Sequence, residues 1–192
     1  NLSKLYLCLK LLIISVLFGS VASAEPVDYW AELRADEGVR MDLGSGDSQS
    51  LMPAAEDATF HFTSSAIAVD GANEQVYATY NRYVDGELTE FIIRMNPDGS
   101  EVEELVQLPR DSESIHTLAV SGAGSRLYWI ENAETFGGTT VFKTANADGS
   151  NVQTLETVEG GFIDGLVVDD QNEKILYILS DGSSTRIMRA GL

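Results

Sequence analysis

Cysteine is nearly absent from this chain of 192 residues, and histidine is almost as rare. The single cysteine is Cys8, and the two histidines are His61 and His116. One cysteine forms no internal disulfide, and two histidines build no zinc site from imidazoles alone. The segment after Cys8 therefore holds itself by burial and offers no thiol nucleophile.

Basic residues are also few, with 12 Lys and Arg against 30 Asp and Glu and a formal net charge of −18. Binding of nucleic acid or of an anionic membrane needs clusters of Lys and Arg, and the sequence contains none. We therefore predict no nucleic-acid partner. The acidic residues are scattered along the sequence rather than gathered in runs, which favours solubility outside the cell. Attraction for cations or for a basic partner is the alternative.

Recognisable catalytic motifs are missing as well. The sequence has no H-E-x-x-H, G-x-S-x-G, Walker or G-x-G-x-x-G motif, and no EF-hand loop. We predict no catalytic residue, no metal site and no cofactor, with calcium kept as the alternative.

The first 24 residues have the three parts of a secretory signal. Lys4 and Lys10 form a basic head, residues 11–18 are apolar, and small residues fill positions 22–24. The apolar run is short for a membrane anchor, which needs about 20 residues. We predict removal of residues 1–24, export to the periplasm or the medium, and no membrane insertion afterwards.

Two independent markers repeat along the rest of the chain. Inner segments recur at 66–80, 117–131 and 165–180, and their tyrosines Tyr77, Tyr128 and Tyr177 lie 51 and 49 residues apart. A second marker, Asn-x-Asp-Gly-Ser, begins at residues 96 and 146, which are 50 residues apart. A shared period in two markers indicates a repeat architecture.

Each unit reads as four short strands. In the first unit we predict strands at 66–69, 76–80, 90–95 and 102–106, a polar loop at 81–89 and a tight turn at 96–99. Four strands in about 50 residues predict an all-β fold, a β-propeller of four-stranded antiparallel blades. An ordinary sandwich or barrel is the alternative.

The repeat also predicts the domain organisation. A lead-in at 25–37 precedes a partial propeller at 38–192, which holds roughly three and a half blades. The predicted units are a part-blade at 38–64, blades at 65–114 and 115–163, and an incomplete blade at 164–192. Three explanations of this short ring stay open: a fragment of a longer protein, two copies that close one ring by self-association, or a small open propeller.

The repeat resembles the YWTD repeat of low-density-lipoprotein receptors and of similar bacterial secreted proteins. The resemblance covers residues 38–192 and is closest at Tyr128-Trp129 and at 145–155. It implies a six-bladed propeller. The Asp that braces neighbouring blades in the family is absent, and Glu131 is the one residue that stands near its place.

Candidate binding residues lie where the innermost strands begin, because propeller ligands gather at the central channel. Ser65, His116 and Asp164 occupy equivalent positions there, one in each unit. We expect a pocket for a metal or a polar ligand, with wet loop ends as the alternative. We also expect Asp70, Asp98, Asp148 and Asp169 to hold turns rather than metals, and the Tyr and Trp side chains to pack between blades.

The predicted function is a secreted, non-catalytic binding or scaffolding module. Its partner is a protein or a polar small ligand. The alternative is a calcium-dependent lactonase-like enzyme, or another propeller hydrolase, whose site is completed by blades outside this chain.

Overall fold

Fourteen β-strands and one short 3₁₀ turn make up the described part of a computed structural model. The structure describes residues 27–32, 37–42, 47–51, 66–109, 113–121, 125–133, 138–172, 174–181 and 183–191. The predicted signal, residues 1–24, lies outside these ranges. Among the described residues, no helix has the length and apolar character needed to cross a membrane.

The strands form four antiparallel sheets that follow one another along the chain. Sheet 1 comprises β1 (Val27–Glu32), β2 (Glu37–Asp42) and β3 (Ser48–Ser50). Sheet 2 comprises β4 (Ile67–Asp70), β5 (Gln75–Val84), β6 (Glu87–Met95) and β7 (Glu103–Pro109). Sheet 3 comprises β8 (Glu113–Val120), β9 (Arg126–Ala133), β10 (Thr139–Asn146) and β11 (Gln153–Glu159). Sheet 4 comprises β12 (Phe162–Asp169), β13 (Lys174–Ser180) and β14 (Thr185–Gly191), with η1 (Asp170–Asn172) joining the first two.

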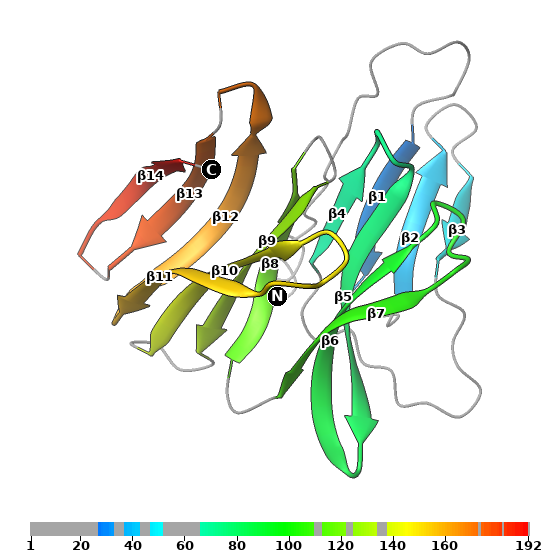
Figure 1. The fold of residues 1–192 in the computed structure, drawn as a ribbon, viewed down its shortest axis with the longest axis horizontal. Coiled ribbons are helices and arrows are strands. Elements are labelled where there is room, and N and C mark those ends of the chain that lie inside the picture. Colours follow the sequence, from blue (N-terminus) through cyan, green and yellow to red (C-terminus); the bar gives the residue numbers. More distant parts are fainter. Residues whose placement is uncertain are drawn as a thin grey trace, which may run out of the picture.

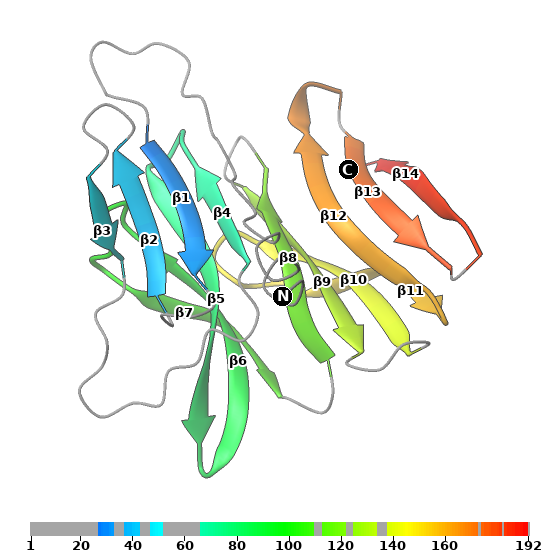
Figure 2. The same ribbon diagram turned by 180° about the vertical axis from the view of Figure 1, so that it is seen from behind.

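Successive sheets lie side by side in the order in which they occur along the chain (Figure 1). The first strands of neighbouring sheets meet, since β4 contacts β8 and β8 contacts β12. The view from behind shows the same order of sheets (Figure 2). Within sheets 2 and 3 the strand order follows the chain from inner to outer strand. The predicted all-β class, with four-stranded antiparallel blades and about three and a half of them present, is confirmed.

The first sheet starts earlier in the chain than the sequence indicates. Strand β1 lies inside the predicted lead-in, residues 25–37, and pairs with β2 from Val27 to Glu32. Sheet 1 thus holds three described strands. Strand β1 precedes the predicted part-blade at 38–64, so the repeat did not predict it.

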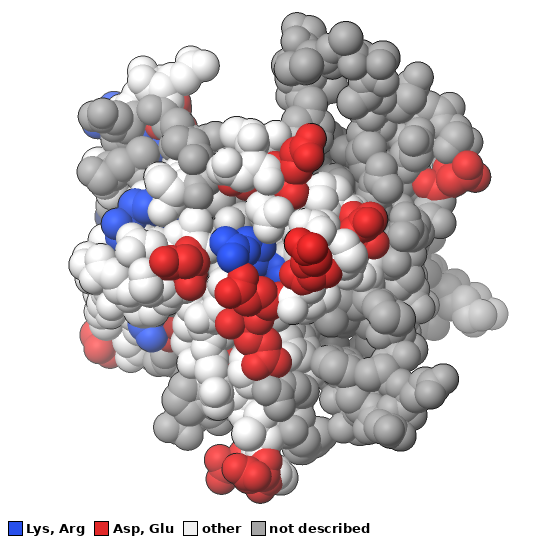
Figure 3. Space-filling view, turned by 45° about the vertical axis from the view of Figure 1, so that its right-hand side comes forward, with Lys and Arg blue, Asp and Glu red and all other residues white. Residues whose placement is uncertain are grey.

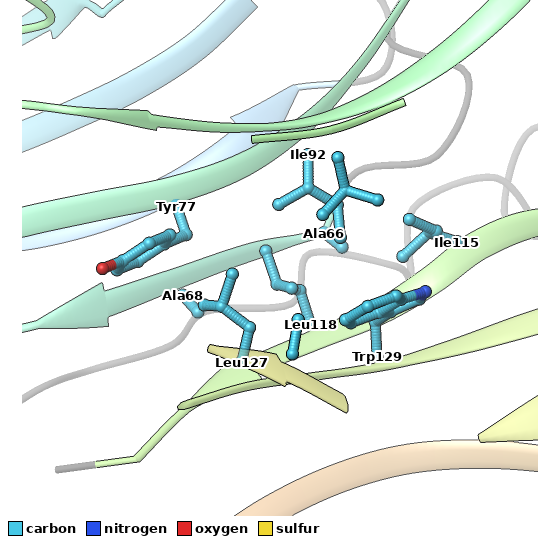
Figure 4. Packing of buried hydrophobic residues seen from close by; sticks show 10 residues of the cluster. Ala66, Ala68, Tyr77, Ile92, Ile115, Leu118, Leu127 and Trp129 are labelled. Atoms are coloured by element: carbon cyan, nitrogen blue, oxygen red, sulfur yellow. The ribbon is translucent and has the colours of Figure 1, made fainter. Parts of the chain in front are cut away.

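The core lies between the sheets. In each sheet, we call the face toward the preceding sheet the leading face and the other the trailing face. Three buried clusters fill the spaces between sheets 1 and 2, 2 and 3, and 3 and 4. Figure 4 shows the middle cluster, where Tyr77 and Ile92 of sheet 2 lie opposite Leu127 and Trp129 of sheet 3. Alternation along each strand supplies both faces, as expected of sheets buried on two sides.

The Asn-x-Asp-Gly turn contacts the preceding sheet. A Cβ added at Gly99 would lie 2.0 Å from the carbonyl oxygen of Leu51, and one at Gly149 would lie 2.4 Å from that of Leu105. Both glycines also have positive φ, 82° and 79°. The second marker therefore repeats because each turn is fitted against the outer strand of the sheet before it.

The predicted loop at 81–89 is wrong. Strands β5 and β6 continue as one long hairpin through this segment, with pairing from Val76 with Met95 to Val84 with Glu87. Only Asp85 and Gly86 form the turn, with φ of 53° and 85°. Asp-Gly is a preferred two-residue hairpin turn, since both central residues need positive φ.

The equivalence of the three repeat tyrosines needs correction. Tyr77 and Tyr128 are the third residues of β5 and β9, whereas Tyr177 is the fourth residue of β13. Neighbouring residues of a strand point to opposite faces, so this slip of one reverses the side chain. Tyr128 on a trailing face and Tyr177 on a leading face meet in the same cluster. All three pack between blades, as predicted.

Candidate functional site

The structure describes the three predicted binding residues to different extents. Ser65 lies outside the described residues. His116 lies in β8 and is exposed, and Asp164 lies in β12, with its backbone described and its side chain outside the description. Each directly follows a fully buried isoleucine, Ile115 or Ile163. The structure thus places His116 and Asp164 at equivalent backbone positions of adjacent inner strands.

A β-bulge interrupts both inner strands at this point. In β8 the register shifts between Ile115 and Thr117, and in β12 it shifts between Asp164 and Leu166. Gly165, inside the second shift, has a φ of 75°. A bulge sets two residues opposite one and changes the direction of the side chains beside it. Its recurrence makes the start of the inner strand a distinct local structure in both sheets.

An aromatic pair joins the two inner strands beside these bulges. The rings of His116 and Phe162 lie with centroids 6.1 Å apart and planes tilted by 53°. Phe162 is 37% exposed although its neighbour Ile163 is fully buried. The sequence analysis did not single out Phe162, because the aligned inner segment of the third unit begins at residue 165. Its signal was the alignment with Ser114, one residue before each buried isoleucine.

Buried polar side chains from the preceding sheet hold the backbone under this pair. The carboxylate of Glu90 accepts a hydrogen bond of 3.0 Å from the Ile115 amide. One sheet further on, the Asn132 side-chain amide donates one of 3.2 Å to the Ile163 carbonyl oxygen. Glu90 and Asn132 are at most 1% exposed. Hydrogen bonds at such low exposure fix the position of each inner strand against its neighbour.

These contacts come from one repeated cross-strand pair. Asn81 pairs with Glu90 in sheet 2, and Asn132 pairs with Thr140 in sheet 3, at the same place in the repeat. Thr140 also donates to the carbonyl oxygen of Gly161, at 3.0 Å. We call this position the brace pair. The sequence analysis missed it, although Asn81 and Asn132 share the 51-residue spacing of the tyrosines.

Glu131 does not take the bracing role. One of its carboxylate oxygens accepts a hydrogen bond of 2.7 Å from the Trp129 indole, and the other lies 2.7 Å from the Lys143 ammonium. All three residues belong to sheet 3, so the described contacts of Glu131 lie within its own blade. The expectation that Glu131 replaces the Asp that braces neighbouring blades in the family is therefore corrected. The brace pairs make these contacts between sheets instead.

The Asp-Gly turns are structural, as predicted. The Asp98 carboxylate accepts hydrogen bonds from the Ser100 amide and hydroxyl at 2.9 and 2.6 Å, and Asp148 binds Ser150 with identical distances. Asp70 accepts bonds from the amides of the turn that follows it, and Asp169 accepts one from the Asn172 amide. These side-chain bonds satisfy turn amides. Within the described ranges, no three His, Cys, Asp or Glu residues gather as metal ligands.

The electrostatics of the surface are acidic with local basic groups. Figure 3 shows acidic side chains scattered over the visible face, with a small basic cluster among them.

At the contact between sheets 3 and 4, the Tyr177 hydroxyl donates a hydrogen bond of 2.5 Å to the Glu156 carboxylate. Burial, followed by the contact with this carboxylate, raises the pKa of Tyr177 to about 12.

Comparison with known proteins identifies the fold and nothing finer. No family model matches the chain, and no curated protein does either. Solved structures similar to it include a nidogen/laminin complex, with 17% identity and a TM-score of 0.61 over 85% of this chain and 60% of that one. An oligogalacturonate lyase in complex with manganese has 12% identity and a TM-score of 0.61 over 86% and 47%.

A third similar structure is the periplasmic gluconolactonase PpgL of Pseudomonas aeruginosa, with 12% identity and a TM-score of 0.55 over 84% of this chain and 49% of that one. The chain thus spans between about half and three fifths of the chains it resembles. The shared architecture is the β-propeller.

Proposed function

We propose that this propeller is an exported, non-catalytic binding module whose ligand site lies at the start of β8 and β12. The observation that carries the proposal is the exposed ring pair of His116 and Phe162 on two braced inner strands. An aromatic face beside an imidazole suits a small ligand with both apolar and polar groups, because the phenyl ring gives contact area and the imidazole gives directed hydrogen bonds. The nidogen/laminin complex offers a precedent for a binding role on this fold.

Rigidity supports this reading. The residues adjacent to both rings, Ile115 and Ile163, are fully buried and hydrogen-bonded to the preceding sheet. A site on fixed strands loses little conformational entropy when a ligand binds. Asp164, at the position in β12 that matches His116 in β8, is the third candidate contact, and Ser65 is the candidate contributed by the preceding unit.

The test uses the imidazole itself as a reporter, since the chain has only two histidines, His61 and His116. His61→Ala leaves the ring signals of His116 alone in a proton NMR spectrum. We would add short aromatic peptides, galacturonate oligomers and gluconolactone in turn. A saturable shift of the His116 signals, lost in Phe162→Ala, supports the binding site. Unchanged signals with every probe contradict it.

A hydrolase or lyase of the metal-dependent kind is the second candidate. Two of the similar structures are a manganese-bound lyase and a gluconolactonase, and Asp164 is the acidic residue nearest the proposed site in the repeat. Calcium would then stabilise the folded state, because a ligand that binds only that state raises the melting temperature. A calcium-dependent rise that disappears in Asp164→Asn, together with gluconolactone hydrolysis, favours the enzyme. No rise favours the binding module.

A further inference from the structure

Several aspartates in this chain are followed directly by glycine, and their surroundings differ in the structure. They are Asp70, Asp85, Asp98, Asp148, Asp164 and Asp181. Asp-Gly is the dipeptide in which an aspartate side chain reacts most readily with the next backbone nitrogen, because glycine has no side chain to obstruct the approach. The product of this reaction is a succinimide ring. The reactivity of each pair in the folded protein depends on what holds its carboxylate and its amide.

Two of these pairs are restrained at both reacting groups. The Asp98 carboxylate accepts hydrogen bonds from the amide and the hydroxyl of Ser100, at 2.9 and 2.6 Å. The Gly99 amide donates a hydrogen bond of 2.9 Å to the Asn96 carbonyl oxygen. The turn at residues 146–150 repeats these bonds with the same distances. The carboxylate and the glycine nitrogen of each pair therefore meet only after these bonds break.

Two further pairs are restrained at the carboxylate. Asp70 is 1% exposed and accepts hydrogen bonds from two amides of the turn that follows it. Asp181 also accepts hydrogen bonds from two amides of its own turn, at 3.1 and 2.9 Å. The side chain of Asp164 lies outside the described residues. Asp85 is the pair that remains for comparison.

Asp85-Gly86 lies in solvent at the turn between β5 and β6. Both residues are exposed, and a Cβ placed on Gly86 would meet no described atom within 4 Å beyond its chain neighbours. Within the described part of the chain, no hydrogen bond reaches the Asp85 carboxylate or leaves the Gly86 amide. The two reacting groups are therefore accessible to each other and to water.

This turn lies at the tip of a hairpin that extends past its neighbouring strands. Strands β5 and β6 pair as far as Val84 with Glu87, whereas the described pairing of β7 with β6 ends at Thr89 and that of β4 with β5 ends at Ala78. Figure 1 shows the hairpin projecting beyond the other strands. A ribbon of two strands is marginally stable, so its last pairs open at low free energy. Opening lets the Asp85 side chain rotate toward the next amide.

We propose that Asp85 is a modification site, at which aspartate converts to isoaspartate as the protein ages. The Gly86 nitrogen bonds to the side-chain carboxyl carbon of Asp85, and the carboxyl hydroxyl leaves as water with the amide proton. Water then adds to the backbone carbonyl of the succinimide, which moves the peptide bond onto the side chain. One water leaves and one enters, so the mass is unchanged and no co-reactant is needed. The product has an extra carbon in a two-residue turn, which then no longer matches the twist of its strands.

The test compares two neighbouring tryptic peptides from the full chain after the folded protein has been incubated for several weeks in neutral buffer. Trypsin releases residues 83–94 and 95–110, which each carry a single aspartate, Asp85 and Asp98 respectively. An isoaspartate peptide keeps its mass but changes its retention time, and a protease that cleaves before aspartate leaves it intact. We expect conversion at Asp85 to be at least about tenfold faster, because Asp98 must first lose two or more hydrogen bonds.

Denatured protein is the matched control for the effect of sequence. In guanidinium chloride the two peptides should convert at similar rates, because both contain Asp-Gly and neither keeps its turn. Asp85→Glu should abolish the isomeric product of residues 83–94, since glutamate would have to close a larger ring. Ser100→Ala should raise the rate at Asp98, because it removes one hydrogen bond to that carboxylate.

The proposal is overturned by equal rates in the folded chain, or by a difference in rate that guanidinium chloride leaves unchanged. An absence of conversion in residues 83–94 overturns it as well, and so does faster conversion in residues 95–110. Circular dichroism at the end of the incubation confirms that the folded sample has kept its sheets.

Discussion

Single residues at the contacts between sheets set how closely the blades approach. Gly149 admits the Leu105 carbonyl because it has no side chain, and Asp148 closes the same turn through Ser150. Its φ of 79° is in the left-handed region, which favours glycine. Gly86 has a similar φ of 85° but open space around it. Gly86 is therefore favoured by its backbone conformation alone, whereas Gly149 is favoured by its backbone conformation and also by the close approach of Leu105.

Gly149→Ala should lower the free energy of unfolding by more than about 2 kcal/mol, because the new methyl group adds a clash with Leu105 to the cost of positive φ. Gly86→Ala, the matched control, carries only the backbone cost of about 1 kcal/mol. Urea denaturation of both variants measures the difference. Equal losses would show that the turn does not rest on the preceding sheet as closely as described.

The pKa of Tyr177 predicts a pH dependence. Its pKa is raised to about 12 in the folded protein from an ordinary value of 10.0, so the folded state holds a proton that the unfolded state has lost between these values. The contribution of Tyr177 to the free energy of unfolding is therefore fully present below pH 10, and it is lost as the pH rises from 10 to about 12. The difference in tyrosinate absorbance between wild type and Tyr177→Phe isolates this titration. A difference that titrates near pH 10 contradicts the buried contact with Glu156.

At the scale of the element, an inner strand is held by the sheet before it. The brace pairs place a buried hydrogen-bonding group of sheet 2 against β8 and of sheet 3 against β12. The long β5–β6 hairpin holds Glu90 at a fixed position, because its register runs without a break from Val76 to Val84. The candidate ligand site depends on this support, since His116 and Phe162 each adjoin a braced residue.

Glu90→Ala removes the acceptor of the Ile115 amide and should cost about 2 kcal/mol, the range for a hydrogen bond to a charged group. Glu90→Gln keeps an acceptor oxygen and should lose less. Hydrogen exchange adds a local readout, because the Ile115 amide should exchange faster in the alanine variant than in the glutamine variant. Identical exchange in both would mean that the brace does not secure β8.

Sequence patterns predicted those elements whose cause is local. The Asp-Gly turns at residues 98 and 148 were predicted because turn chemistry lies in adjacent residues. The hairpin through residues 81–89 was not predicted, since its polar side chains resemble a loop. Tyr177 was aligned with Tyr77 and Tyr128, although it lies one residue further along its strand, because residue spacing alone does not fix strand register. Of the candidate site, His116 and Asp164 were aligned correctly, while Phe162 and Glu90 depend on contacts between sheets that no single strand encodes.

At the scale of the whole molecule, stability is built from contacts between neighbouring sheets. Each cluster of the core joins two successive sheets, and sheets 2 and 3 are covered on both faces. Among the described residues, the cluster that packs on sheet 4 lies on its leading face, and Ile187 and Val167 are exposed on the other. Repeat-like folds of this type distribute stability as a sum of sheet and interface contributions.

Hydrogen exchange should therefore follow a gradient along the chain. Amides of β9, in the covered sheet 3, should be the most protected, and those of β13 should open at lower free energy. The measurement is residue-resolved hydrogen exchange on the full chain. Protection of β13 equal to that of β9 would contradict a molecule stabilised sheet by sheet.

The direction of the brace pairs has a consequence for assembly. Both described braces reach forward, from Glu90 to Ile115 and from Asn132 to Ile163. A chain that folds from its first residue onward thus completes each docking platform before the strand that needs it has arrived. In that order, β8 and β12 each find a polar partner already in position on the sheet before them. Sheets 2 and 3 would then each serve as a template for the inner strand of the next sheet.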